Sequence, residues 1–179
     1  MTDESIMEAV KNGDLDQASE LFDRYHMRLY NYFVKISYDR EASNDLTQNV
    51  FLRMIRYRNS YKEGNKFVSW IFQIARNVYA DHYRKNTARF SDFTDLESIS
   101  QEASSQLENM EQAEKEKTLH RSLAMLSEDQ REILVMSRFQ ELKYDEIAKI
   151  TDTTVANVKV KVHRAIKKLR DTYFELEKI

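Results

Sequence analysis

Residues 144–170 read YDEIAKITDTTVANVKVKVHRAIKKLR, a pattern typical of two helices joined by a tight polar turn. The first helix is short, about residues 144–150, and residues 151–154 hold no large apolar side chain. The second helix is long and strongly basic, since residues 153–170 contain six Lys or Arg and no acidic residue. A short helix, a short turn and a basic second helix predict a helix-turn-helix.

The last helix has two different faces at about 100° per residue. The stripe predicted to face the core holds Val155, Val158, Val162, Ala165, Ile166 and Leu169. The opposite face and its flanks hold Ala156, Asn157, Val160, Lys161, His163, Arg164, Lys167 and Lys168. A valine beside an Asn and an Arg suits a major groove, where these side chains match thymine, adenine and guanine edges. Lys159, Lys167, Lys168 and Arg170 suit phosphates. A solvated helix with no ligand would carry the same charges, but the preceding helix and turn favour DNA binding.

Composition favours an all-helical protein. The chain has 179 residues with 41% hydrophobic and 32% charged residues, no Cys, no Pro and two glycines, Gly13 and Gly64. Sandwiches, Rossmann units and P-loops need Gly-rich turns, and disulfides or Cys-ligated zinc need Cys. The acidic start lacks the features of a signal peptide, and no apolar run reaches the length of a membrane span. We therefore expect a cytoplasmic, all-α protein without membrane insertion.

Charge is segregated along the chain, although 28 basic residues nearly balance 30 acidic ones. Residues 51–90 hold nine basic and two acidic residues, whereas residues 91–117 hold eight acidic and two basic ones. The stretch from Ser91 to about Gln112 is rich in Ser, Asp, Glu and Gln, which is typical of a flexible linker. We predict two small helical domains, 1–90 and 118–179, joined by an acidic linker over 91–117.

The basic block of the N-terminal domain contains many aromatic residues. Apolar stripes at helical spacing flank a polar segment, 58–66, that predicts a loop. A basic groove with stacking aromatics is how single-stranded nucleic acid is held. Phe67 and Trp70 fall on the apolar stripe and are expected in the core, so Tyr61 of the loop is the better candidate for stacking on a base.

Four stretches together give a resemblance to a known family. They are 45–53 (DLTQNVFLR), 70–77 (WIFQIARN), 144–148 (YDEIA) and 158–165 (VKVKVHRA) with 167–170 (KKLR). In this order, with an acidic stretch in the middle, the chain resembles a bacterial RNA polymerase sigma factor of the extracytoplasmic-function (ECF) class of the sigma-70 family. The resemblance covers about residues 21–170.

The resemblance implies partners and roles for individual residues. It implies binding to core RNA polymerase, with the clamp helices of the largest subunit contacting Asp45, Leu46, Gln48, Phe51 and Arg53. It implies capture of the melted promoter −10 strand by Tyr61, Lys66, Arg76, Asn77 and Arg84. It implies reading of the −35 duplex by Asn157, Lys159, Val160, Lys161, His163, Arg164 and Lys167. The first helices of the C-terminal domain would bind the flap of the second-largest subunit, and the linker would run toward the RNA exit path.

This chain departs from the family pattern at two sites. The family often has Gly-Thr before Val158 and Ser-Arg after Lys159, where this chain has Ala156-Asn157 and Val160-Lys161. The loop before Phe67 commonly carries Pro or further Gly, where this chain has Gly64, Asn65 and Lys66. We therefore expect a different −35 sequence and a changed base preference at −10.

Three other classes of protein explain the sequence less well than a sigma factor does. The four His residues lack metal-site spacing, and the acidic pairs 128–129 and 145–146 suit helix starts, so we expect no catalysis, no metal and no cofactor. A dimeric helix-turn-helix regulator explains the last helix but not the aromatic, basic loop. A decoy that binds only an anti-sigma factor conflicts with intact Asn77 and Arg164. An anti-sigma factor is an expected partner of a sigma factor.

Overall fold

The computed structural model describes residues 1–87 and 107–179, and within these ranges every regular element is helical. The N-terminal half contains α1 (Asp3–Lys11), α2 (Ala18–Ser37), α3 (Arg40–Arg56) and α4 (Phe67–Thr87), with 3-10 turns η1 (Leu15–Gln17) and η2 (Arg58–Ser60). The C-terminal half contains α5 (Leu107–Ala124), α6 (Glu128–Leu134), the π-helical segment η4 (Val135–Phe139), α7 (Tyr144–Ile150) and α8 (Val155–Glu177). The predicted all-α class is confirmed. In the described part of the chain, no helix is long and apolar enough to cross a membrane.

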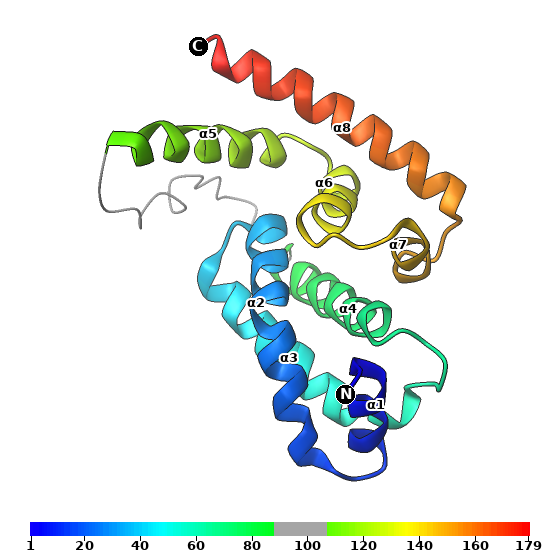
Figure 1. Cartoon of the computed structure of the whole chain (residues 1–179). Helices are drawn as coiled ribbons and strands as arrows, with labels where there is room; N and C mark the ends of the chain where they lie inside the picture. Colours follow the sequence, from blue (N-terminus) through cyan, green and yellow to red (C-terminus); the bar gives the residue numbers. More distant parts are fainter. Residues whose placement is uncertain (88–106) are drawn as a thin grey trace.

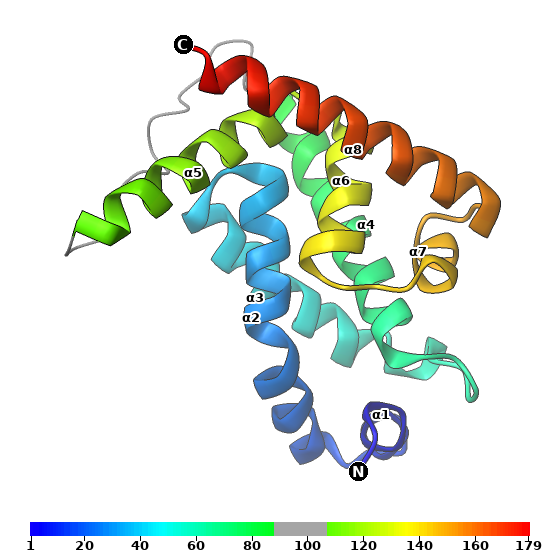
Figure 2. The ribbon, with the colours of Figure 1, turned by 45° about the horizontal axis from the view of Figure 1, so that its top comes forward.

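Helices α2 and α3 form a helical hairpin against which α4 packs (Figures 1 and 2). The chain reverses at Tyr38, which closes α2 in the left-handed conformation with a φ of 59°. Asp39 then caps α3, because its carboxylate accepts a hydrogen bond from the Ala42 amide. Apolar residues recur at helical spacing in these helices, so one face of each helix is buried and the opposite, polar face is exposed.

The C-terminal half contains the predicted helix-turn-helix, formed by α7, a turn and α8. Its turn passes through Asp152 at a φ of 52°, and the Thr154 hydroxyl caps α8 by accepting from the Asn157 amide at 3.2 Å. Helices α5 and α6 pack against α8. Helix α6 starts with the predicted capping box, in which Ser127 and Gln130 bond to each other's backbone amides.

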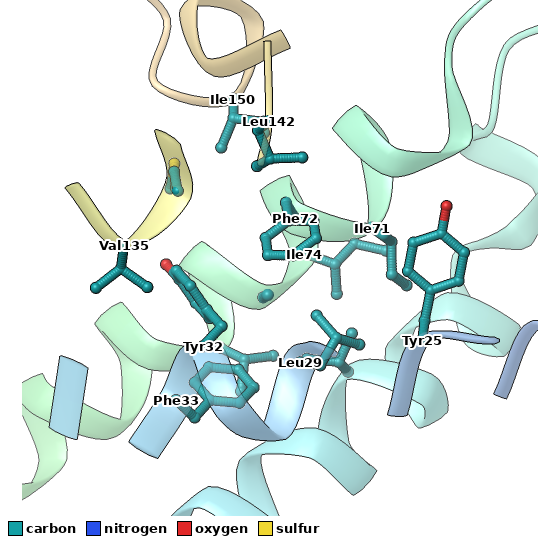
Figure 3. Packing of buried hydrophobic residues seen from close by; sticks show 14 of the residues in the cluster. Tyr25, Leu29, Tyr32, Phe33, Ile71, Phe72, Ile74, Val135, Leu142 and Ile150 are labelled. Atoms are coloured by element: carbon teal, nitrogen blue, oxygen red, sulfur yellow. The ribbon is translucent and has the colours of Figure 1, made fainter. Parts of the chain in front are cut away.

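The two halves pack against each other around α4. Helix α4 contacts α7, and α2 contacts α6 and η4. Figure 3 shows Val135 of η4 opposite Tyr32 of α2, and Leu142 and Ile150 above Phe72 of α4. Buried side chains of both halves therefore form one continuous hydrophobic core.

The predicted linker lies mostly outside the described residues. Its residues 91–106 are not described, whereas its last part, 107–117, belongs to α5, which packs against α8. The acids of 107–117 are thus carried on a helix rather than on a loop. The division into domains 1–90 and 118–179 stays a prediction.

Candidate nucleic-acid interface

The outward face of α8 carries the residues predicted to read the −35 duplex. Six of the seven are exposed: Asn157, Lys159, Val160, His163, Arg164 and Lys167. Behind them Val158, Val162 and Ala165 are buried, so the predicted core stripe is correct except for the exposed first residue, Val155. Val160 is 45% exposed among cations. An apolar side chain exposed to water between positive charges could be covered by the edge of a base in the major groove, where the thymine methyl group offers an apolar contact.

Two residues of this face have partners within the C-terminal half. Lys161 is half-buried, and its Nζ lies 3.1 Å from a carboxylate oxygen of Asp129 on α6. The Asn157 side-chain amide donates to the Thr153 hydroxyl at 2.8 Å, which holds it over the first turn of α8. Lys161 is therefore a bridge between α6 and α8, whereas Asn157 is held in a defined position on the surface.

The loop before α4 differs from the expectation at Tyr61. The Tyr61 side chain is 1% exposed, and its ring packs edge-on against Trp70 with 5.2 Å between centroids. Its hydroxyl donates to the Asn65 carbonyl at 2.5 Å. A ring enclosed in this way offers no face to a base, so in this arrangement Tyr61 is an internal anchor of the loop. The loop's surface consists of the exposed residues 62–66.

The other predicted −10 residues differ in what they contact. Asn77 and Arg84 of α4 are exposed, and Arg84 pairs with Asp81 at 2.6 Å. Arg76 instead lies 2.9 Å from Glu132 of α6. Lys66 lies 3.1 Å from Glu146 and 3.7 Å from Asp145, both on α7. Two of the predicted strand-binding cations are thus paired with carboxylates of the C-terminal half.

A groove of about 390 Å³ separates α4 from α6 and contains part of this charge pairing. Its α4 side carries Arg76 and Arg84, which are two turns apart, and its α6 side carries Glu128, Asp129 and Glu132. The sequence assigned Glu128 and Asp129 to a helix start and gave Glu132 no role, and nothing in the spacing of these acids indicated that they face α4.

Helix α3 carries the predicted docking surface for core polymerase. Asp45 and Gln48 are exposed, but Leu46 and Phe51 are buried and support the surface from behind. Arg53 is half-buried and pairs with Asp81 of α4 at 2.8 Å. The prediction missed Leu52, which is 68% exposed. Leu52 follows Gln48 by four residues, and residues at this spacing share a helix face, so the sequence could have placed Leu52 on the same surface as Gln48.

These features define a class: an all-helical protein with a helix-turn-helix in its C-terminal half and an exposed basic face on the last helix. Models of two regions of the sigma-70 family match the chain. Sigma-70 region 2 matches residues 21–89, and Sigma-70 region 4 matches residues 116–169. The chain belongs to the sigma-70 family, in its extracytoplasmic-function class. It is a non-catalytic specificity subunit of RNA polymerase that acts in transcription initiation.

Relatives of known function match nearly full length. The RNA polymerase sigma factor YlaC of Bacillus subtilis is 26% identical over 152 residues, which cover 84% of this chain and 88% of YlaC. The ECF sigma factor SigM of the same organism is 29% identical, with 86% and 93% covered. The sigma factor CarQ of Myxococcus xanthus is 27% identical, with 96% and 97% covered.

Solved structures share the fold. CnrH in complex with the cytosolic domain of CnrY has a TM-score of 0.72 at 18% identity, with 94% of this chain and 95% of that chain covered. The sigma factor RpoE of Bartonella quintana, in complex with the anti-sigma factor NepR, has a TM-score of 0.68 at 21% identity, with 86% and 94% covered.

Proposed function

We propose that this sigma factor selects promoters with two separate surfaces. The exposed face of α8 reads the −35 duplex through Asn157, Val160 and Arg164, and Lys159, His163 and Lys167 contact the backbone. The loop surface 62–66 and helix α4 hold the melted −10 strand, through Lys66, Arg76, Asn77 and Arg84. The observation that carries this proposal is the exposed face of α8, where the apolar Val160 side chain lies among exposed cations.

Core polymerase would dock on the exposed side of α3. Asp45, Gln48 and Leu52 form a mixed polar and apolar surface there, with Arg53 at its edge. The first helices of the C-terminal half would meet the flap of the second-largest subunit. Because the polymerase works on the chromosome, we place the action of this chain in the cytoplasm.

An anti-sigma factor is the further partner that we propose. RpoE of Bartonella quintana, which shares this fold, was solved with an anti-sigma factor bound. The groove between α4 and α6 and the exposed residues of α3 are surfaces that such a protein could cover.

The test is in vitro transcription with purified bacterial core polymerase on a pooled genomic template, followed by sequencing of the transcript starts. A sigma factor of this kind makes core start at discrete sites that share an upstream and a −10 motif. Binding to core without new starts would favour a decoy that serves only an anti-sigma factor. Failure to bind core would favour a helix-turn-helix regulator.

Two variants test whether α8 reads the upstream motif. Val160→Ser replaces an apolar contact with a hydroxyl, so the upstream motif should change at one position. Lys178→Ala removes a charge from the C-terminal end of α8 and is the matched control, which should leave the motif unchanged. An unchanged motif with Val160→Ser would exclude Val160 from base readout.

A further inference from the structure

Helix α1 precedes the part of the chain that matches region 2, yet it is firmly attached to the rest of the N-terminal half. Ile6, Met7 and Val10 are fully buried, and the helix packs against α2, α4 and η2. Figure 1 shows α1 at the same end of the molecule as the loop that leads into α4. The buried apolar face explains why α1 packs against the N-terminal half. It does not explain why polar side chains of α1 bond to the loop before α4.

Glu4 of α1 caps the first turn of α4. Its Oε1 accepts a hydrogen bond from the Phe67 amide at 3.0 Å, across 63 residues of sequence. The first amides of a helix have no partner within the helix, and Lys66, which precedes α4, has no side-chain acceptor to offer. A carboxylate at a helix N-terminus is also favoured by the helix dipole. Glu4 therefore fixes the end of the loop where α4 begins.

Lys11, at the other end of α1, fixes the beginning of the same loop. Its Nζ donates to the Tyr61 carbonyl oxygen at 2.7 Å. The Tyr61 ring is enclosed, and burial raises the pKa of its hydroxyl to about 12, with Glu4 and Glu8 adding to the effect. That hydroxyl in turn holds the Asn65 carbonyl. The segment 61–67 is thus tied at both ends to α1 and across its middle by Tyr61.

We propose that α1 is part of the promoter-reading apparatus, and that Glu4 and Lys11 are positioning residues which set the base preference of the −10 loop. Residues 62–66 are the exposed part of this segment, so they are what a captured strand can touch. A pocket selects among bases only if its shape is held before binding, since a loose loop adapts to several. The inference rests on the proposed capture of the −10 strand.

The experiment uses the full chain with core polymerase and a promoter library randomised over the −10 element. Glu4→Ala removes the cap and Lys11→Met removes the donor, while Glu4→Gln and Lys11→Arg retain an acceptor and a donor. Hydrogen exchange of the free protein at amides 61–67 reports directly on the loop. We expect exchange there to rise and the preference for the best −10 base to fall about fivefold for each lost hydrogen bond.

The controls separate positioning from general damage to the fold. Arg24→Gln breaks the ion pair that joins Arg24 of α2 to Asp3 of α1, together with the pair between Arg24 and Glu20 within α2, and it should leave the −10 preference unchanged. The conservative variants should restore the preference, and the upstream motif should be unaffected throughout. Faster loop exchange with an unchanged −10 preference would overturn the inference. If the unmodified chain selects no −10 motif, the proposed function fails and the inference fails with it.

Discussion

Tyr61 takes part in three interactions: its ring is buried, its hydroxyl donates to the Asn65 carbonyl, and its backbone carbonyl accepts from Lys11. We expect Tyr61→Ala to lower the free energy of unfolding by about 3–5 kcal/mol, as for other large buried aromatics. Tyr61→Phe loses only the hydroxyl, at a cost of about 1 kcal/mol. Urea denaturation measures both changes. If Tyr61 were instead an exposed residue that stacks on a base, neither substitution would lower the stability, and Tyr61→Ala would only weaken binding of the single strand.

The sequence could not predict the burial of Tyr61. Its polar neighbours, residues 58–60 and 62–66, correctly predicted a loop, and aromatic residues in loops are often exposed. What covers Tyr61 is α1, whose Lys11 precedes it by 50 residues, together with Trp70 and Phe67. Contacts of that separation leave no periodicity in the sequence, whereas the stripes that bury Leu29 or Val158 do.

His120 on α5 makes the stability of the chain depend on pH. Burial lowers its pKa from the ordinary 6.5, and Lys35 of α2 and Arg40 of α3 lower it further against the opposing effect of Glu116. Its Nδ1 is buried and has no hydrogen-bond partner among the described residues. Because the unfolded chain binds the proton more readily, stability is complete above pH 6.5 and falls as the pH drops from there toward the lowered pKa.

The measurement is the urea midpoint at about pH 7.5 and at about pH 5.5, on either side of the ordinary His pKa. We expect the midpoint to fall at the lower pH, and His120→Gln to reduce that fall. The same replacement at His163, which is exposed on α8, serves as the control. An equal pH response of the parent chain and His120→Gln would show that other groups cause the loss.

The capping box of α6 is an element-scale feature that the sequence predicted in full. The Gln130 amide donates to the Ser127 hydroxyl at 3.3 Å, and the Gln130 side chain accepts from the Ser127 amide at 3.4 Å. Ser127→Ala should cost about 1 kcal/mol of unfolding free energy, and Ser127→Asp should retain most of the stability. Thermal unfolding of the two variants tests this, and an unchanged stability of Ser127→Ala would mean that the cap contributes nothing.

Helix α8 was predictable because its two faces are repeated over many turns. Six of the seven residues expected on the −35 face are exposed, and Lys161 is the exception because Asp129 of α6 lies within reach of it. By contrast, the π-helical segment η4 has no signature in the sequence. It follows α6 directly, in a stretch where Val135, Met136 and Ser137 are all buried.

On the exposed face of α8, we expect replacement of Arg164 and replacement of Lys167 to change DNA binding in different ways. Arg164→Ala should relax the preference at one upstream base pair, by about 1–3 kcal/mol. Lys167→Ala should weaken binding to all promoters alike and reduce the slope of log affinity against log salt by about 1. Both are measured with the holoenzyme on promoter duplexes over a salt series. Uniform weakening by Arg164→Ala would reassign Arg164 to a phosphate.

At the scale of the whole molecule, carboxylates of the C-terminal half form ion pairs with basic side chains of the N-terminal half. Glu132 accepts from Arg76 at 2.9 Å and from the Tyr32 hydroxyl at 3.2 Å, and Glu146 accepts from Lys66 at 3.1 Å. The sequence showed a basic block at 51–90, but it could not show that Glu132 and Glu146, which lie outside the acidic stretch 91–117, meet its cations. That pairing depends on how the halves pack, which composition does not encode.

The same cations cannot hold these carboxylates and promoter phosphates together. If Lys66 and Arg76 bind the −10 strand, the closed arrangement of α4 against α6 and α7 opens first. The pairs are partly exposed to solvent, so each contributes little to closure. Because such pairs are screened by ions, closure should also weaken as salt rises.

The double variant Glu132→Gln, Glu146→Gln tests the role of these pairs. It keeps side-chain size while removing both charges, so the free protein should open more readily. We expect a larger radius of gyration in X-ray scattering and tighter binding of a single-stranded −10 oligonucleotide by the free protein. Glu175→Gln, an exposed residue near the end of α8, makes the same kind of charge change away from the contact and should do neither. If strand affinity rises equally with Glu175→Gln, the gain reflects overall charge. If scattering is unchanged, the apolar contacts of Val135, Leu142 and Ile150 hold the halves closed without help from the ion pairs.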